Sequence, residues 1–167
     1  MVRWEPPLCK KTEFGIYGFF EEYRCFSNFH VLKTPIVFSD GITYPTSEHL
    51  YMALKTLNLD VRKAISLAST GAKAKALGRE VLLRPDWDRF HTKAMYLAVK
   101  EKFDANEDIR EILLSTGLLY LEETNWWNDT FWGVCDGVGE NMLGKTLMQV
   151  RDAYRSRTNE LSRLPKP

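Results

Sequence analysis

A carboxylate and an amine at helical spacing are the side chains in this sequence best suited to chemistry. Glu48, Met52 and Lys55 recur at i, i+4 and i+7, a spacing that lines one face of a helix. On such a face the backbones of Glu48 and Lys55 are about 10 Å apart. Both long side chains could then reach one ligand. The alternative is a pair of solvated surface charges, which is the commoner outcome for a Glu and a Lys.

The residues around this pair predict the elements that position it. Pro45 and Thr46 favour a helix start, because proline suits the first helical positions and threonine caps the free amides. A second stripe of Leu50, Leu54 and Leu57 predicts that this helix continues past residue 55. Just before it, an Asp-Gly pair between β-branched runs predicts a hairpin over residues 35–44.

A second candidate is Asp129, which lies in a tryptophan-rich segment, residues 125–133. Tryptophans at this density either fill the core or stack on a ligand. A carboxylate among them loses solvation, which raises its pKa unless it is hydrogen-bonded. Such a group suits a general acid or base, or a binder of sugar hydroxyls. Asn128 would orient it.

Two further residues have both a structural and a functional interpretation. Trp87 follows an Arg-Pro-Asp sequence; it is either a hydrophobic staple at a helix start or a stacking platform for a planar base. Arg79 follows Gly78, and is either a solvated arginine at a helix C-terminus or a phosphate partner.

The string at residues 139–146 matches the Walker A pattern, but its context does not. No buried strand precedes it, and the remaining chain has no room for the βαβ units of a P-loop enzyme. A helix start after a glycine turn explains the string. A second interpretation is a turn that binds phosphate without NTPase chemistry, with Gly144 and Lys145 as contacts.

Composition narrows the class of protein. The chain has 167 residues, enough for a single domain, and a net charge of +1 that gives no global field for nucleic acid. Its three cysteines and three histidines show no disulfide framework and no metal spacing. We expect no metal and no cofactor. The absence of a signal sequence and of a long apolar run predicts a soluble, cytoplasmic protein, and a monomer is expected.

The whole pattern predicts an α+β fold, mainly helical with a small antiparallel sheet. We expect an irregular arm over residues 1–13, one domain over 14–155 and a frayed tail over 156–167. In the longest expected helix, residues 88–104, Met95, Val99 and Phe103 face inward and Lys102 is solvated. Asp60 is the expected cap of the helix over residues 60–69. Further helices are expected over residues 72–77, 108–115 and 141–155.

Taken in order, several motifs resemble the YbiA-like, or NADAR, family. They are FSNF at 26–29, YPTSEH at 44–49 with Lys55, GR at 78–79, RPDW at 84–87, ND at 128–129, WG at 132–133, and the residues Asn141, LG at 143–144 and LM at 147–148. The resemblance covers residues 14–154. It implies an α+β domain with N-glycosidase activity, either on phosphorylated riboflavin-biosynthesis intermediates or on guanine carrying ADP-ribose. The chain departs from the family's pattern in its first thirteen residues and at residues 21–25, which bears on substrate preference.

The resemblance also implies roles for residues. Glu48, Trp87, Asp129 and Trp132 fall on the family's active-site positions, and Lys55 on its conserved lysine. Breaking a ribose N-glycoside develops positive charge at C1 and negative charge on the leaving nitrogen. Glu48 would then stabilise C1 or activate water, Asp129 would protonate the leaving nitrogen, and Lys55 could capture C1 as a Schiff base. The expected substrate-binding residues are Ser27, Asn28, Arg79, Trp87, Asn128, Trp132, Gly144 and Lys145.

From this we expect a glycohydrolase that removes ADP-ribose from guanine, with ADP-ribosylated DNA or RNA as partner. An N-glycosidase acting on riboflavin intermediates is the first alternative. A non-catalytic ADP-ribose-binding module is the second, although a mere binder has no need of a paired acid and amine.

Overall fold

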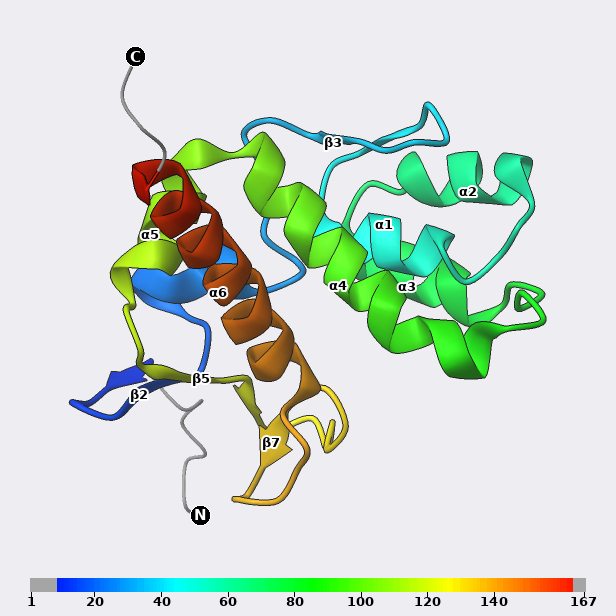
Figure 1. Cartoon of the computed structure of the whole chain (residues 1–167). Helices are drawn as coiled ribbons and strands as arrows, with labels where there is room; N and C mark the ends of the chain where they lie inside the picture. Colours follow the sequence, from blue (N-terminus) through cyan, green and yellow to red (C-terminus); the bar gives the residue numbers. More distant parts are fainter. Residues whose placement is uncertain (1–8, 164–167) are drawn as a thin grey trace. The chain divides into compact units, whose positions relative to one another are not determined.

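The computed structural model describes residues 9–163, and their backbone contacts divide into two compact units. One unit contains residues 27–110; the other combines the described residues before 27 with those from 111 onward. Helices dominate and the strands are short (Figure 1), which confirms the expected α+β class. One boundary between the units falls inside helix α5 (Glu107–Ser115) and the other directly after Phe26, so no linker in the sequence marks the division.

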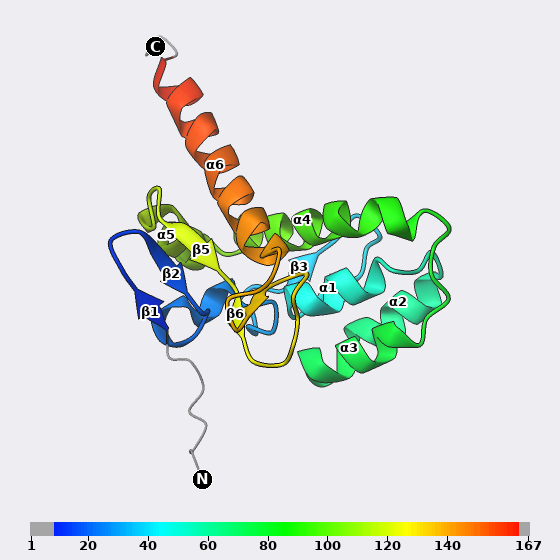
Figure 2. The same cartoon turned by 90° about the horizontal axis from the view of Figure 1, so that it is seen from below.

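The unit of residues 27–110 is built around helix α1 (Ser47–Ala53), which packs against three other helices. These are α2 (Leu59–Ser66), α3 (Gly71–Arg79) and α4 (Trp87–Ala105). In Figure 2, α1 lies between α3 and α4. The predicted hairpin precedes it as β3 (Ile36–Val37) and β4 (Thr43–Tyr44), paired antiparallel.

Side-chain caps define the starts of α1, α2 and α3. Thr46 caps α1 as predicted. The cap of α2 is Asn58, so the prediction for Asp60 was wrong: Asn58 Oδ1 accepts from the amides of both Asp60 and Val61. Helix α3 starts after the cap Thr70 and continues through Gly78, longer than expected.

The core of this unit follows the predicted apolar stripe of α4. Met95, Val99 and Phe103 are buried, as predicted. The prediction that Lys102 is solvated is wrong. Lys102 is 0% exposed, and its Nζ donates to the carbonyl oxygen of Ser27 at 2.9 Å. A lysine on a helical pattern is usually solvated; this one donates to a backbone oxygen that the sequence pattern does not place beside it.

The other unit contains three strands of one small sheet, β1 (Lys10–Lys11), β2 (Gly15–Tyr17) and β5 (Tyr120–Glu122), and the 3-10 helix η1 (Glu21–Phe26). It also contains β6 (Thr124–Asn125) and β7 (Val134–Cys135). The prediction of a purely antiparallel sheet is wrong, because β2 pairs parallel with β5, and β6 pairs parallel with β7. Parallel strands cannot be joined by a tight hairpin turn, so no local turn signal reveals them.

The ends of the described chain are more regular than predicted. Lys10–Lys11 form a strand inside the expected arm, and helix α6 (Met142–Arg163) extends past the expected end at residue 155. No glycine or proline interrupts the sequence between Asn141 and Leu164 except Gly144, so nothing stops the helix at 155. The remaining parts of the arm and tail, residues 1–8 and 164–167, lie outside the described residues.

Candidate functional site

Glu48 lies in the first turn of α1 and is 4% exposed. Asn28 holds this end of the helix. Its carbonyl oxygen accepts from the Glu48 amide (3.0 Å), and its Oδ1 accepts from Ser47 Oγ (3.0 Å). Asn28 Nδ2 lies 3.2 Å from Met95 Sδ on α4. Asn28, which the sequence predicts as a substrate contact, therefore fixes the backbone that carries Glu48.

The neighbouring His49 is buried and hydrogen-bonded on both ring nitrogens. Nε2 donates to the carbonyl oxygen of Ala68 (3.0 Å), which leaves Nδ1 to accept from the Thr46 hydroxyl (2.8 Å). Burial lowers the pKa of His49, against the opposing effect of the Ala68 carbonyl. This arrangement fits a neutral, structural histidine.

Lys55 lies just beyond α1, not on it. The helix ends at Ala53 and its last turn tightens, because the amides of Lys55 and Thr56 bond to oxygens three residues back. The predicted continuation of the apolar stripe is wrong here, since Leu57 is 59% exposed.

The Lys55 amine is nevertheless electrostatically coupled to Glu48. Burial is the largest influence and lowers the pKa of Lys55. The Glu48 carboxylate raises it, while the cations Arg79 and Lys75 lower it further. The predicted residues Glu48 and Arg79 thus both act on Lys55 within this unit. Lys75 was not singled out from the sequence, although it lies one helical turn before Arg79.

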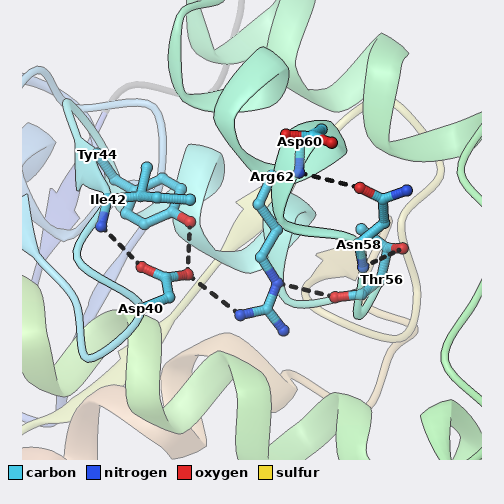
Figure 3. A network of polar contacts seen from close by, with 7 residues as sticks. All are labelled: Asp40, Ile42, Tyr44, Thr56, Asn58, Asp60 and Arg62. Atoms are coloured by element: carbon cyan, nitrogen blue, oxygen red, sulfur yellow. Dashed lines mark hydrogen bonds and ion pairs between the residues drawn. The ribbon is translucent and has the colours of Figure 1, made fainter.

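A buried polar network holds the turn that carries Lys55. The guanidinium of Arg62 lies between two acceptors (Figure 3): its Nε donates to the Thr56 carbonyl oxygen (2.8 Å), and its Nη1 pairs with Asp40 Oδ2 (3.1 Å). The Tyr44 hydroxyl donates to the same Asp40 oxygen (2.9 Å). The sequence indicates only a turn at Asp40, because the partners of this side chain lie on other elements.

A second backbone contact holds the turn from the α4 side. The amide of Arg84 donates to the Lys55 carbonyl oxygen at 2.7 Å. The Arg84 side chain pairs with Asp86 (2.6 Å) and lies 3.8 Å above the Phe90 ring. Its charge is therefore already balanced inside its own segment.

Trp87 packs at the start of α4, whereas its stacking on a planar base stays a prediction. It is the first residue of α4 and packs on Tyr51 of α1, with ring centroids 5.6 Å apart, and on Phe90, at 6.5 Å. It is only half-buried, so part of the ring faces solvent.

The half-buried Ser27 uses its Oγ as the acceptor for the Phe29 amide.

In the other unit, Asp129 is built into a tightly bonded loop. Its amide and carbonyl both bond to the side chain of buried Asn125, at 3.1 and 2.8 Å. Asp129 Oδ1 accepts from the Trp132 amide at 2.8 Å. Asn125 was not singled out from the sequence, where it is one polar residue among several. Asn128 is exposed, with φ at 65°.

The aromatic residues of this loop are not all core. Trp126 and Trp127 are 39% and 47% exposed, and Trp126 stacks on Phe20 with ring centroids 5.5 Å apart. Trp132 packs edge-on against Phe131.

The Walker-like string has a structural explanation. The first amides of α6, those of Met142 and Leu143, donate to the carbonyl oxygens of Phe131 and Trp132. A methyl group at Gly144 would collide with the Leu121 carbonyl oxygen. These contacts favour the interpretation that the string is a helix start packed on β5, whereas Lys145 is exposed.

Comparison with known proteins decides the family. A model of the NADAR domain matches residues 15–155. The chain belongs to the NADAR family. Within it, the chain is 42% identical over 151 residues to N-glycosidase Npun_R5314 of Nostoc punctiforme, covering 84% of this chain and 91% of that one.

Two further NADAR relatives are informative. N-glycosidase YbiA of Escherichia coli is 34% identical over 148 residues, which cover 87% of this chain and 90% of YbiA. The NMR structure of E. coli YbiA matches with a TM-score of 0.76 at 34% identity, covering 88% of this chain and 87% of that one. A maize protein named riboflavin biosynthesis protein PYRR is 35% identical over 152 residues, which cover 82% of this chain but 24% of PYRR.

Two negative findings concern this NADAR chain. Within residues 9–163, no three His, Cys, Asp or Glu side chains gather closely enough to hold a metal ion. Over that same range, none of the helices combines the length and the apolar character needed to cross a membrane.

Proposed function

We propose that the protein is an N-glycosidase that cleaves the bond between ribose C1 and a nitrogen in a phosphorylated ribosyl substrate. The observation that carries this proposal is the coupling of the buried Glu48 carboxylate to the Lys55 amine, whose pKa burial lowers. A binding module does not need such a pair. The relatives named N-glycosidases support the same conclusion.

Glu48 supports either of two routes. As a carboxylate it stabilises positive charge at C1, or it removes a proton from the attacking water. In the direct route, water adds to C1, the C1–N bond breaks, and the leaving nitrogen takes a proton.

Lys55 allows a covalent route when the leaving nitrogen is exocyclic. The ring oxygen leaves C1 and takes a proton, which gives an imine between C1 and the leaving nitrogen. The neutral Lys55 amine adds to C1 and the substrate amine departs with a proton, leaving an imine on Lys55. Water then releases the sugar aldehyde and restores the amine.

Three other predicted roles remain part of the proposal. Trp87 stacks on a planar base with its exposed part. Asp129 donates the proton to the leaving nitrogen, and Trp132 contacts the substrate. Each is tested by its own variant, Trp87→Ala, Asp129→Asn or Trp132→Ala, because only activity can assign these roles.

The proposed substrate is guanine carrying ADP-ribose, in DNA or RNA, because it offers a planar leaving group to the aromatic side chains. The name of the maize relative favours a second candidate, the phosphorylated intermediates of riboflavin biosynthesis. Both substrates are phosphorylated ribosyl amines.

A product assay tests the proposal. The protein and its Glu48→Gln variant are incubated with an oligonucleotide ADP-ribosylated on guanine, and separately with a phosphorylated ribosylamino-pyrimidine. Mass spectrometry then measures the released sugar. Release by the wild type alone supports the glycosidase and identifies its substrate. Tight ADP-ribose binding without any release would favour the non-catalytic binding module.

A further inference from the structure

Helix α3 is held unusually close to α1. A Cβ added to Gly78 would lie 2.7 Å from Met52 Cβ, closer than two such atoms can approach. At the other end of α3, a Cβ on Gly71 would lie 2.8 Å from a ring carbon of Phe29. The absence of side chains at both glycines lets the α3 backbone pack directly on its neighbours, which brings the charges of Lys75 and Arg79 toward Lys55.

Two cations of α3 lie on the face that acts on Lys55. Lys75 and Arg79 are spaced i, i+4, so their Cβ atoms are about 6 Å apart on one helix face. Lys75 is half-buried with its Nζ 5.7 Å from the centroid of the Phe29 ring, and Arg79 is exposed. Both charges influence the Lys55 amine, and Glu48 is the opposing carboxylate.

This group of charges is unbalanced. Elsewhere in the unit, Arg62 pairs with Asp40, and Arg84 pairs with Asp86. Among the residues that the structure describes, neither Lys75 nor Arg79 forms an ion pair with a carboxylate. Among the charges that act on the Lys55 amine, Lys75 and Arg79 are cations and Glu48 is the opposing carboxylate, so positive charge is in excess, an arrangement that favours an anionic ligand.

We propose that Lys75 and Arg79 form the site on α3 that binds the substrate's phosphate or pyrophosphate and places the ribose beside Glu48 and Lys55. An arginine fork and a lysine point charge are the usual phosphate-binding side chains of proteins. The assignment rests on the proposed function and specifies how that site recognises its substrate. It also assigns a role to Lys75.

The test compares Lys75→Gln and Arg79→Gln with a matched control, Lys73→Gln. Lys73 lies on the same helix and is exposed, and its charge is not among those that act on Lys55. Calorimetry measures ADP-ribose and inorganic pyrophosphate binding in a Glu48→Gln background, where turnover does not interfere. We expect about tenfold weaker binding of both probes for each test variant, the loss typical of a charge-assisted hydrogen bond, and wild-type affinity for Lys73→Gln.

Steady-state kinetics provide the second readout. In the catalytically active background, at a pH high enough for Lys55 to be neutral in every variant, KM is expected to rise about tenfold for Lys75→Gln and Arg79→Gln while kcat changes little. Circular dichroism melting of each variant excludes unfolding as the cause.

The outcomes separate this inference from the glycosidase itself. Weakened binding in the two variants, without turnover by the wild type, supports the anion site and refutes the glycosidase. Normal wild-type turnover, with affinity and KM unchanged in Lys75→Gln and Arg79→Gln, overturns the anion site but not the glycosidase proposal. The anion site is also overturned if neither probe binds in the Glu48→Gln background and the wild-type protein does not bind pyrophosphate either.

Discussion

The guanidinium of Arg62 donates to the carbonyl oxygen of Thr56, the residue directly after Lys55, at 2.8 Å. Asp40 fixes the other side of that guanidinium, and Tyr44 fixes Asp40. A charge pair on the hairpin and α2 thereby holds the turn on which the candidate amine lies.

Breaking this pair should damage both stability and activity. Asp40→Asn leaves the Arg62 charge buried without its counterion, which we expect to lower the free energy of unfolding by about 3 kcal/mol. The activity per folded molecule should fall too, because the Lys55 turn loses its anchor. Urea unfolding and kcat measured below the transition test both effects.

Lys63→Met is the matched control, since Lys63 is exposed on the same helix. It should leave both quantities unchanged. A stable Asp40→Asn variant with full kcat would show that the network does not position Lys55.

Trapping with borohydride should reveal the Lys55 imine and its charge environment. Burial, Arg79 and Lys75 lower the pKa of Lys55, whereas Glu48 raises it. The rate of adduct formation with a ribosyl substrate should therefore rise with pH through a depressed pKa. Lys75→Gln should move this curve to higher pH and Glu48→Gln to lower pH. Peptide mass mapping locates the adduct.

Opposite displacements by these two variants would establish the direction of each charge effect. Lys55→Ala provides the control, since it removes the amine altogether. Full activity of Lys55→Ala, with no adduct in the wild type at any pH, would eliminate the covalent route in favour of direct water attack.

Acid should destabilise the protein partly through His49. Its pKa is lowered by burial in the folded state, so the unfolded chain binds the proton more readily, and stability rises with pH. The contribution of His49 is complete above its unfolded pKa of about 6.5 and is lost as the pH falls below it. Denaturant unfolding between pH 7.5 and pH 5 should show a smaller slope for His49→Gln than for the wild type. Equal slopes would mean that His49 does not contribute.

Gly144→Ala separates packing from phosphate binding in the Walker-like string. The new methyl group meets the Leu121 backbone and the Asn141 side chain, so we expect a loss of about 1–3 kcal/mol in unfolding free energy, as in other overpacked sites. Lys145→Gln, next to it and exposed, should change neither stability nor pyrophosphate affinity. A Lys145→Gln variant that lost pyrophosphate affinity would restore the phosphate-binding interpretation of this turn.

Local signals in the sequence predicted much of the first turn of α1 and of the core of α4. The Thr46 cap, the Asp-Gly hairpin and the stripe of Met95, Val99 and Phe103 each depend on neighbours within a few residues. The Glu48–Lys55 pair was recognised for the same reason. Its electrostatic coupling is present even though the helix ends before Lys55.

Contacts between distant segments could not be predicted. The burial of Lys102 depends on the Ser27 carbonyl oxygen, and the Arg62 network depends on a hairpin more than twenty residues earlier. Nothing in the sequence distinguishes Lys75 from other helical lysines. Its charge acts on Lys55 because α3 packs on α1. Periodicity describes one element at a time, so it contains no information on these pairings.

The pairing of Gly15 with Tyr120 has a consequence for synthesis on the ribosome. Residues 27–110 emerge as one continuous stretch and can complete their own contacts while translation continues. Strand β2 emerges earlier but must wait for β5, so its unpaired edge stays exposed during that interval. Nascent chains stalled before residue 120 should accordingly be more protease-sensitive at residues 15–17 than within α4.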